Sequence, residues 1–282
     1  MKNSSLFRET WIRIRQNKLA MVGLVLLCLL VLIAIFADVI APYGYEEQHL
    51  SEAYQKPSST YIFGTDEFGR DIFSRVIYGS RISLFVGFVA VSIAAVIGVL
   101  LGAIAGYYGS FTDNVIMRAM DIILAVPQIL LAIAIVSAFG SSLINLMIAT
   151  GISTAPNYAR LMRASVLSLK EQEFIEAARA AGTSNFKIIF RHILPNSLSP
   201  ILVQATFGVG LAIIAIAGLS FIGLGLQPPT PEWGAMLSTG RTFIRNYPYM
   251  TIFPGLAIAV TVFSLNVLGD GLRDALDPKL RD

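Results

Sequence analysis

The chain has 282 residues, 55% of them hydrophobic and 14% charged, and its mean hydropathy is +0.68. Soluble domains carry about a quarter charged residues, so this composition excludes an ordinary soluble domain and indicates a membrane protein. The net charge of +3 is scattered between apolar runs without a basic stripe, which excludes a nucleic-acid-binding surface. The single cysteine, Cys28, allows neither a disulfide framework nor a cysteine-based metal site.

Six apolar segments are long enough to cross a bilayer, because about 20 helical residues span about 30 Å of hydrocarbon. They are residues 20–41, 82–106, 117–139, 142–159, 200–225 and 250–270. The first run is longer than the apolar core of a signal peptide and lacks a cleavage site, so we expect it to remain as an anchor. The sequence therefore predicts an all-α membrane protein with six transmembrane helices.

The basic residues set the orientation of these helices, since positively charged loops stay in the cytoplasm. With a cytoplasmic N-terminus, fifteen of the 21 Lys and Arg residues fall in the inner segments. Both termini are then cytoplasmic, and residues 160–199 form the largest cytoplasmic loop. We divide the chain into residues 1–81, with the first span and an outer loop, and residues 82–282, a five-helix core.

Two outer segments carry recognisable local patterns. Apolar residues between Ile72 and Ile77 share one helical face, and Asp71 and Arg75 are spaced as an i,i+4 pair, which predicts a short helix at the outer interface. This helix is either a plain interfacial anchor or a collar that contacts another subunit. After the fifth span a proline-rich turn leads to Trp233, which we expect at the membrane interface.

The second span carries a stripe of small residues, in which Ala90, Ala94, Gly98, Gly102 and Gly106 recur every fourth position. Such a stripe lets another helix backbone approach closely. We interpret it as a packing surface, either within this subunit or against a second one.

Several polar residues lie inside the predicted spans, where polar groups need a partner or a function. Asp121 follows Arg118 by three residues, which predicts an ion pair, and Pro127 predicts a kink in the third span. The uncharged ones are Gln128, Asn145, Asn157, Gln204 and Asn266. They form hydrogen bonds between helices or line a hydrated pathway, and the sequence leaves both interpretations open.

The large cytoplasmic loop is predicted to start with a short helix. Ser168 and Glu171 have capping-box spacing, so the helix should begin near Leu169 and stop at Gly182. A contact face follows from helical spacing, and it consists of Phe174, Ala177, Ala178 and Ala181. This face packs either on the protein's own helix ends or on a cytosolic partner.

A second short helix should run over residues 185–194 and end before Pro195. Ser199 and Pro200 then read as the N-cap and first residue of the fifth membrane helix.

The loop resembles the EAA loop of the transmembrane subunits of ABC importers. The residues that carry the resemblance are Glu176, Ala177, Ala178, Gly182, Leu194 and Pro195. One position departs from the usual pattern, because His192 replaces an apolar residue, and the peptide-importer branch commonly shows this form. The resemblance implies a coupling helix that docks on a cytosolic ATPase subunit. The residues implied in ATPase coupling are Phe174, Glu176, Ala177, Ala178, Ala181, Gly182, His192, Leu194 and Pro195.

Two further stretches, residues 63–84 and 219–237, resemble the C-type permeases of dipeptide and oligopeptide importers. The resemblance implies a type I ABC importer permease fold in the bacterial inner membrane. It also implies four kinds of partner: a homologous second permease, two cytosolic ATP-binding subunits, an extracytoplasmic substrate-binding protein and membrane lipid. Nickel and glutathione importers share much of this pattern, so they stay as alternative functions.

The absence of several sequence motifs excludes further classes of function. The sequence has no phosphate-binding loop, so ATP and Mg²⁺ should be used by partner subunits and no cofactor bound directly. Two histidines and the absence of a nucleophile motif argue against a hydrolase or a metal centre, and we expect no catalytic residue. A secondary transporter would carry inverted repeats and a buried acidic cluster, and neither is visible.

Overall fold

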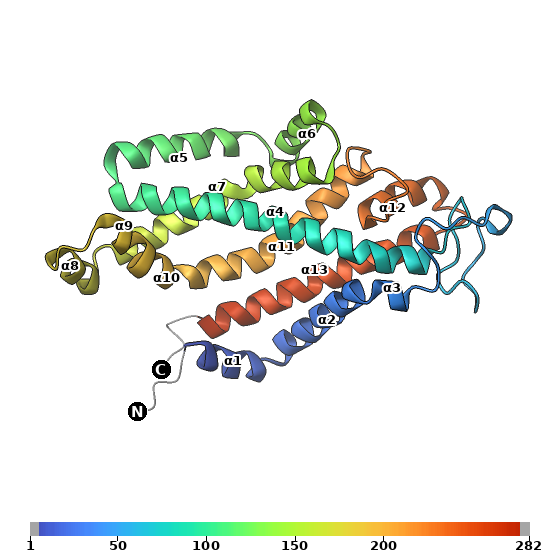
Figure 1. Ribbon diagram of the computed structural model, residues 1–282, viewed down its shortest axis with the longest axis horizontal. Coiled ribbons are helices and arrows are strands. Elements are labelled where there is room, and N and C mark those ends of the chain that lie inside the picture. The colour runs from blue at the N-terminus through green and yellow to red at the C-terminus, as the bar shows by residue number, and fades with distance from the viewer. Residues whose placement is uncertain (1–5, 277–282) are drawn as a thin grey trace.

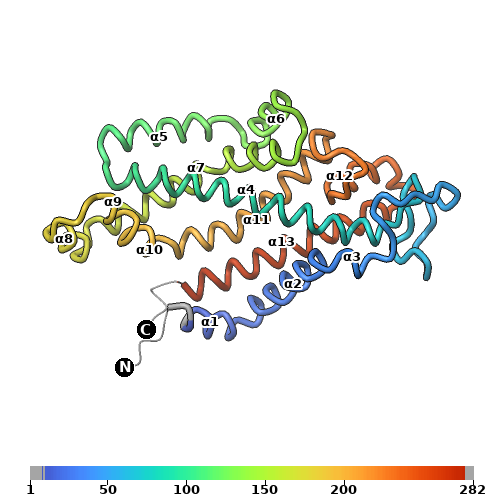
Figure 2. The backbone as a smooth tube through the Cα atoms, in the orientation of Figure 1, coloured from blue at the N-terminus to red at the C-terminus, as the bar shows by residue number. Residues whose placement is uncertain are grey.

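The long helices lie side by side along the longest axis of the molecule (Figure 1). The computed structural model describes residues 6–276, which are helices and loops apart from one isolated antiparallel bridge between Thr65 and Asp71. The short helices α8, α9 and α10 lie at one end, and the loop that precedes α4 lies at the other (Figure 1). Helix α1 and the end of α13 lie toward the same end as α8 (Figure 2).

The N-terminal part is a broken helix followed by an irregular segment. Helices α1 (Leu6–Gln16) and α2 (Lys18–Ile35) are separated at Asn17, whose Oδ1 accepts a hydrogen bond from the Ala20 N–H at 3.1 Å and caps α2. The short α3 (Ala37–Ile40) follows, so the predicted span 20–41 is interrupted at Phe36. Beyond it the 3₁₀ turn η1 (Leu50–Glu52) precedes α4.

Helix α4 (Ile72–Tyr108) is one continuous helix of 37 residues. The short interfacial helix predicted at residues 72–77 is therefore wrong, because these residues are the first turns of α4. Asp71 does not pair with Arg75: its Oδ2 accepts from the N–H and the hydroxyl of Ser74, at 2.8 and 2.7 Å, and caps the helix. A capping carboxylate accepts hydrogen bonds from N–H groups of the first helical turn that otherwise lack a partner, which explains why Asp71 bonds to Ser74 and not to Arg75. Helix α4 also runs unbroken through residue 81, where the sequence analysis divides the chain.

The predicted third span is two helices rather than one. Helices α5 (Ser110–Ala125) and α6 (Gln128–Phe139) meet at an angle of 87°. Proline has no N–H to donate and disfavours helical geometry in the residue before it, and Val126 is accordingly extended. The kink predicted at Pro127 is thus a full break (Figure 2).

The remaining long helices are α7 (Leu143–Leu169), α11 (Leu198–Phe221) and α13 (Tyr249–Leu276). Within residues 6–276, four helices are long and apolar enough to cross a membrane, namely α2, α4, α11 and α13, and the bent pair α5–α6 makes a fifth if counted as one span. Helix α7 continues beyond the predicted span 142–159 to include Arg160 and Arg163, which lowers its apolar character. The structure therefore shows an all-helical membrane protein with four to five candidate spans.

The small-residue stripe of α4 lies buried against α7. Ala94 is fully buried, and a Cβ atom on Gly98 would lie 2.5 Å from the carbonyl oxygen of Ala155. On Gly102 it would lie 2.3 Å from the carbonyl oxygen of Ala159, and on Gly106 2.8 Å from the Cβ of Val166. The two helix backbones approach so closely that no side chain fits between them.

The cytoplasmic loop of the sequence analysis folds as two short helical segments. Helix α8 (Glu173–Ala180) starts after Gln172, so the capping box predicted at Ser168 is wrong, because α7 continues through that residue. The second segment comprises α9 (Asn185–Lys187), η2 (Ile188–Ile193), which is π-helical, and α10 (Leu194–Asn196). Helix α11 begins at Leu198, so Ser199 and Pro200 lie in its first turn rather than at its cap.

Helix α12 (Trp233–Gly240) and the 3₁₀ turn η3 (Arg241–Phe243) connect α11 to α13 toward the end opposite α8. Trp233 is only 1% exposed, so the interfacial position predicted for it is wrong. Its indole N–H donates to the carbonyl oxygen of Val76 at 2.9 Å, and this bond satisfies the buried ring and ties α12 to α4.

Candidate functional site

Helix α8 turns one face to its own chain and the opposite face to solvent. Ile175 is 0% exposed and Ala178 is half-buried against the same apolar cluster of α4 and α7 residues. Phe174, Ala177 and Ala181 are exposed. The predicted contact face is therefore divided, because Ala178 belongs to the inner side and the other three residues to the outer side.

Gly182 ends α8 in a left-handed conformation, with φ of +74°. Its N–H donates to the Arg179 carbonyl at 2.9 Å, and the Thr183 N–H donates to the Ala178 carbonyl at 3.0 Å. This pair of bonds is a Schellman motif, which satisfies the last carbonyl groups of a helix and sets the direction of the following chain. No other atom lies within 4 Å of a Cβ built on Gly182, so only backbone geometry restricts this position.

Glu176 lies in the first turn of α8 and is exposed. A helix that began near Leu169, as predicted, would have Glu176 in its middle, so the later start of α8 corrects its position. A carboxylate in the first turn stabilises the helix through the helix dipole. Glu176 therefore has a structural role in addition to the partner contact predicted for it.

The second helical segment adds two exposed aromatic rings that sequence reasoning missed. Phe186 is 68% exposed, and its ring centroid lies 4.4 Å from that of Phe190, which is also exposed. The helical spacing of the two residues was a visible signal. Together with Phe174 they give this end of the molecule three exposed phenylalanines, which we call the aromatic tip.

The remaining residues of the predicted coupling set lie on the inner side of this segment or at its end. Leu194 packs against the apolar cluster beneath α8, while His192 is half-buried and Pro195 is exposed. Fully buried Ile188 and Ile193 anchor the segment. The buried side chains thus hold the two short helical segments on the core, and the aromatic tip is exposed on their other side.

The uncharged polar residues of the predicted spans do not gather around one cavity, and Asn157 is exposed on α7. Asn145 donates from Nδ2 to the carbonyl oxygens of Phe139 and Gly140, at 2.8 and 2.9 Å, so its amide caps the end of α6. Gln204 is half-buried on α11 and Asn266 is exposed on α13. Gln128 borders a cavity large enough for a solute.

That cavity, of about 220 Å³, lies between α6, α7 and α11. Its lining includes Gln128 and Ala132 of α6, Thr150 of α7, and Leu211 of α11. Thr150 is 1% exposed and its hydroxyl has no hydrogen-bond partner within the described chain. Sequence reasoning missed Thr150, because a threonine in an apolar run is an ordinary residue until its partner is found to be absent. The lining carries no charged side chain.

Ion pairs join α5 to α7. Asp121 pairs with Arg160 at 2.6 Å and not with Arg118, so the pairing predicted along the helix is wrong. Asp113 accepts hydrogen bonds from both the Nε and Nη2 groups of Arg163. Spacing along one helix could not reveal these partners, because they come from another helix.

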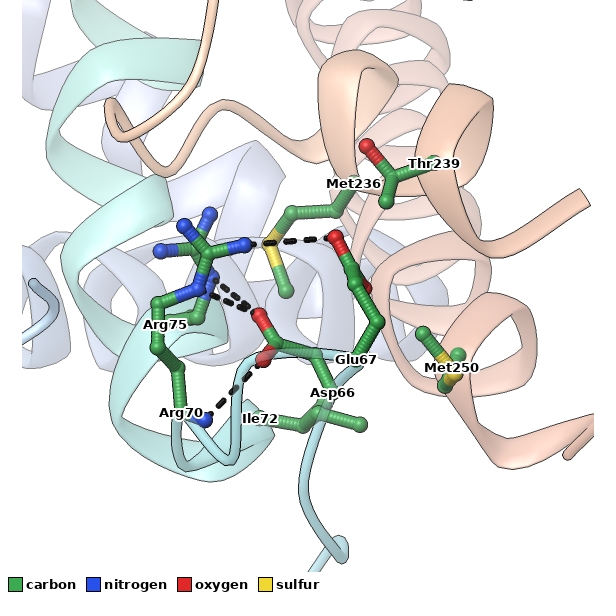
Figure 3. Close-up of a pocket in the computed structure, with 8 residues that line it drawn as sticks. All are labelled: Asp66, Glu67, Arg70, Ile72, Arg75, Met236, Thr239 and Met250. Atoms are coloured by element: carbon green, nitrogen blue, oxygen red, sulfur yellow. Dashed lines mark hydrogen bonds and ion pairs between the residues drawn. The ribbon is translucent and has the colours of Figure 1, made fainter. Parts of the chain in front are cut away.

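The end of the molecule opposite α8 carries a buried charged cluster (Figure 3). Asp66 accepts from the Arg70 side chain at 2.6 Å, and its other oxygen accepts the N–H groups of Phe68 and Arg70, both at 2.9 Å. Arg75 lies 3.7 Å from Asp66 and donates to the carbonyl oxygens of Tyr45 and Pro229, at 2.8 and 3.1 Å. The adjoining cavity is about 20 Å³, too small for a solute, so this cluster ties the loop that precedes α4 to α4 itself.

Glu67 is the less satisfied acid of this cluster. Its Oε1 lies 3.4 Å from Arg70, and its buried Oε2 has no partner within residues 6–276. Burial, aided by the charge of Asp66, raises the pKa of the Glu67 carboxyl. Because the pKa is higher in the folded state, this group favours folding at low pH, and the contribution is lost as pH rises through the folded pKa.

These contacts predict opposite results for two neighbouring variants. Asp66→Asn should destabilise the protein by about 3 to 5 kcal/mol, because it leaves buried guanidinium groups without their anion. Glu67→Gln should leave stability at neutral pH unchanged or higher and flatten the acid dependence, because it removes a poorly paired buried charge. Thermal unfolding in detergent between pH 4 and pH 8 measures both, and equal losses in the two variants would contradict this account.

Among the described residues no group of three or more His, Cys, Asp or Glu side chains could hold a metal ion.

Comparison with known proteins identifies the family. Residues 98–282 match the family described as binding-protein-dependent transport system inner membrane component, and residues 5–57 match the N-terminal transmembrane domain of oligopeptide transport permease C. The chain belongs to the OppC-type permeases of binding-protein-dependent ABC importers. As such it is a multi-pass inner-membrane transport subunit and not a catalytic enzyme, and its transport system includes an ATPase and a binding protein.

Curated relatives match the permease over nearly its whole length. It is 54% identical over 275 residues to the dipeptide transport system permease protein DppC of Alkalihalophilus pseudofirmus, covering 98% of this chain and 90% of the relative. It is 50% identical over 276 residues to the glutathione transport system permease protein GsiD of Escherichia coli, covering 98% and 91%.

Solved structures share the fold of the permease. An inward-facing MetNI methionine ABC transporter matches with a TM-score of 0.59 at 19% identity, over 72% of this chain and 97% of that one. An amino acid ABC transporter crystallised with histidines matches with a TM-score of 0.55 at 18% identity, over 72% and 95%. These likenesses show the ABC importer permease fold.

Proposed function

We propose that this permease forms half of the translocation pathway of an ATP-driven importer for peptide substrates. The main support is that two relatives, at 54% and 50% identity, are named as permeases of dipeptide and glutathione transport systems. Glutathione is itself a small peptide, so the common chemistry is a short peptide chain. A dipeptide or oligopeptide is the first candidate, glutathione the second, and a nickel complex the third.

The aromatic tip and α8 support a docking site for cytosolic ATP-binding subunits. Phe174, Phe186 and Phe190 are exposed while the helices beneath them are anchored, so the surface is ready-formed. Rigid, exposed aromatic residues are common anchors of protein interfaces. One chain presents one such surface, and a pair of ATPase subunits therefore requires a homologous second permease.

The uncharged cavity between α6, α7 and α11 supports a place on the pathway. Gln128 and the unpartnered Thr150 hydroxyl supply hydrogen-bonding groups for a peptide amide, and the other lining residues are apolar. Gln204 and Asn266 remain candidate pathway residues that lie away from this cavity.

Uptake by the reconstituted system tests the proposal. Proteoliposomes that hold both permeases, both ATPase subunits and the binding protein should accumulate a labelled dipeptide only when ATP is enclosed. Omitting the ATPase subunits should abolish uptake. Unlabelled dipeptide, glutathione and nickel ions as competitors decide between the three substrate classes, and uptake driven by an ion gradient without ATP would overturn the proposal.

The proposed topology has six membrane passes with both termini in the cytoplasm, and α5–α6 and α7 supply the third and fourth passes. Lys187 is exposed on the segment at the α8 end, while Ser58 and Thr239 lie in elements at the opposite end. A reporter fused after Lys187 should therefore be cytoplasmic, and reporters after Ser58 or Thr239 should be outside. Labelling of a cysteine at position 187 by an impermeant outside reagent would contradict this arrangement.

A further inference from the structure

Helix α1 presents an outward face that combines apolar and basic side chains. Trp11 and Ile12 are 41% and 45% exposed, and Arg8 and Arg15 are exposed as well. At 100° per residue, these four residues fall within a sector of about 100°. Ile14, at 7% exposed, lies outside this sector and packs inward. We call the sector formed by Arg8, Trp11, Ile12 and Arg15 the α1 outer face.

The inward contacts of α1 and α2 show where this face points. Buried Ile14 of α1 and Ala20 of α2 meet the same residue of α13, Ala275, in one small apolar cluster. Both helices thus turn their inner sides to α13 and their outer sides away from the bundle. The outer side of α2 carries exposed aliphatic residues such as Leu19 and Val25, at 65% and 51% exposed, as a lipid-facing helix does. The α1 outer face continues this surface beyond the end of the span.

The cations of this region have no ion-pair partner among the described side chains. Residues 6–18 contain Arg8, Arg13, Arg15 and Lys18 against a single acid. No ion pair between described side chains involves any of these four cations. By contrast, the arginines that join α5 to α7 and Arg70 beside Asp66 are paired. Arginines without an ion-pair partner among the described side chains therefore lie beside a tryptophan, at the end of a lipid-facing helix, where an anion would complete the site.

We propose that the α1 outer face binds the headgroups of anionic phospholipids in the cytoplasmic leaflet. The choice of leaflet rests on the topology proposed above. In this arrangement the Trp11 and Ile12 side chains enter the region between headgroups and acyl chains, where tryptophan is favoured. The Arg8 and Arg15 guanidinium groups reach lipid phosphates, while their methylene chains stay beside apolar surface.

A lipid partner fits the α1 outer face better than a protein partner. The face continues the exposed aliphatic surface of α2, as the headgroup-level end of a lipid-facing helix does. Arginine forms charge-assisted hydrogen bonds with phosphate groups. The interfacial region accommodates both the apolar ring and the polar N–H of tryptophan. The ATPase subunits would instead be received by the aromatic tip, which belongs to a different part of the fold.

The chain carries its own reporter for the test, because it has two tryptophans and the other, Trp233, is 1% exposed. The full-length permease is reconstituted in vesicles of phosphatidylcholine with about 30% phosphatidylglycerol, so that an anionic surface is present. In one sample only the phosphatidylglycerol acyl chains are brominated, and in the other an equal amount of phosphatidylcholine is brominated. Subtracting the signal of Trp11→Phe leaves the fluorescence of Trp11.

Quenching of Trp11 should be stronger with brominated phosphatidylglycerol. The two lipids are present at equal brominated mole fraction, so the ratio of their quenching measures preference for the anionic headgroup. We expect an apparent preference of about fivefold or more, falling as salt screens the surface. Trp233, read in the Trp11→Phe variant, should show no preference.

Two single variants provide a matched comparison. Arg15→Gln and Arg13→Gln each remove one positive charge from α1, but Arg13 is half-buried and borders a cleft with Asp274 of α13. Arg15→Gln should reduce the lipid preference about fivefold, whereas Arg13→Gln should leave most of it. Arg15→Lys should retain part of the preference, since it keeps the charge.

Three outcomes would overturn the proposal. Equal quenching by the two brominated lipids would show that the face lacks headgroup preference. Absence of quenching by either lipid would place Trp11 in water. Quenching in the isolated permease that disappears in the complex with the ATPase subunits would assign the face to a protein partner. None of these outcomes bears on peptide uptake, so the proposed function and this inference fail separately.

Discussion

Gly102→Leu is expected to abolish assembly of the helical bundle and, with it, transport. A Cβ atom at this position would lie 2.3 Å from the carbonyl oxygen of Ala159 and 2.9 Å from the Cβ of Met162. The nearest obstacle is backbone of α7, which cannot rotate away as a flexible side chain can. The variant must therefore separate α4 from α7, and core overpacking already costs about 1–3 kcal/mol when only side chains are displaced.

Graded alanine variants make this prediction quantitative. Gly102→Ala should lower the free energy of unfolding by about 1–3 kcal/mol. Gly218→Ala is the matched control, because Gly218 also lies in a long apolar helix but has no other atom within 4 Å of its added Cβ. It should raise stability by up to about 1 kcal/mol through helix propensity. Unfolding by SDS and abundance in the membrane measure both, and a fully active Gly102→Leu permease would show that the bundle tolerates the separation.

Gly182→Val is expected to lower coupled uptake by about tenfold or more while the permease stays inserted. Valine at φ of +74° is strained, because a β-branched side chain clashes with its own backbone in the left-handed region. The open space around Gly182 means that relief comes from a changed exit of the chain from α8, not from repacking of the core. The change re-aims Phe186 and Phe190 relative to Phe174, and so alters the aromatic tip.

The control for this variant is a glycine that ends another helix in the same way. Gly223 also has a positive φ, of +85°, open space around an added Cβ and the same pair of Schellman hydrogen bonds, but it follows α11 at the end away from α8. Gly223→Val should therefore reduce uptake far less. The measurements are ATPase stimulation, uptake and co-purification of the ATPase subunits, with membrane abundance as the reference. Normal coupling in Gly182→Val would show that the loop is only a connector.

Glu176 and Ala178 need different tests from those that their sequence positions suggest. Glu176→Gln is preferable to Glu176→Ala, because a first-turn carboxylate also supports α8 itself. A larger residue at Ala178 should disturb the protein's own fold, since Ala178 packs inward on the core cluster. Ala177 is exposed, so a larger residue there should affect docking alone.

The sequence by itself determined the membrane class, the family and the positions of the long apolar helices. These properties depend on composition and local spacing. Apolar runs of sufficient length enter the bilayer, basic residues beside them orient the helices, and proline interrupts a helix. Gly182 as the end of α8 belongs to the same class, because the backbone conformation of a helix end is a local property.

Only the tertiary structure decided which side chains meet. Asp121 pairs with an arginine of a second helix and not with Arg118. Asp71 caps the start of α4 and does not pair with Arg75. Trp233 is buried between α4 and α12, because its ring fits there and the Val76 carbonyl oxygen accepts its N–H. The unpartnered Thr150 hydroxyl and the outward face of α1 likewise exist only once helices are packed. Pairing depends on distances across the bundle, and a linear spacing carries no information about them.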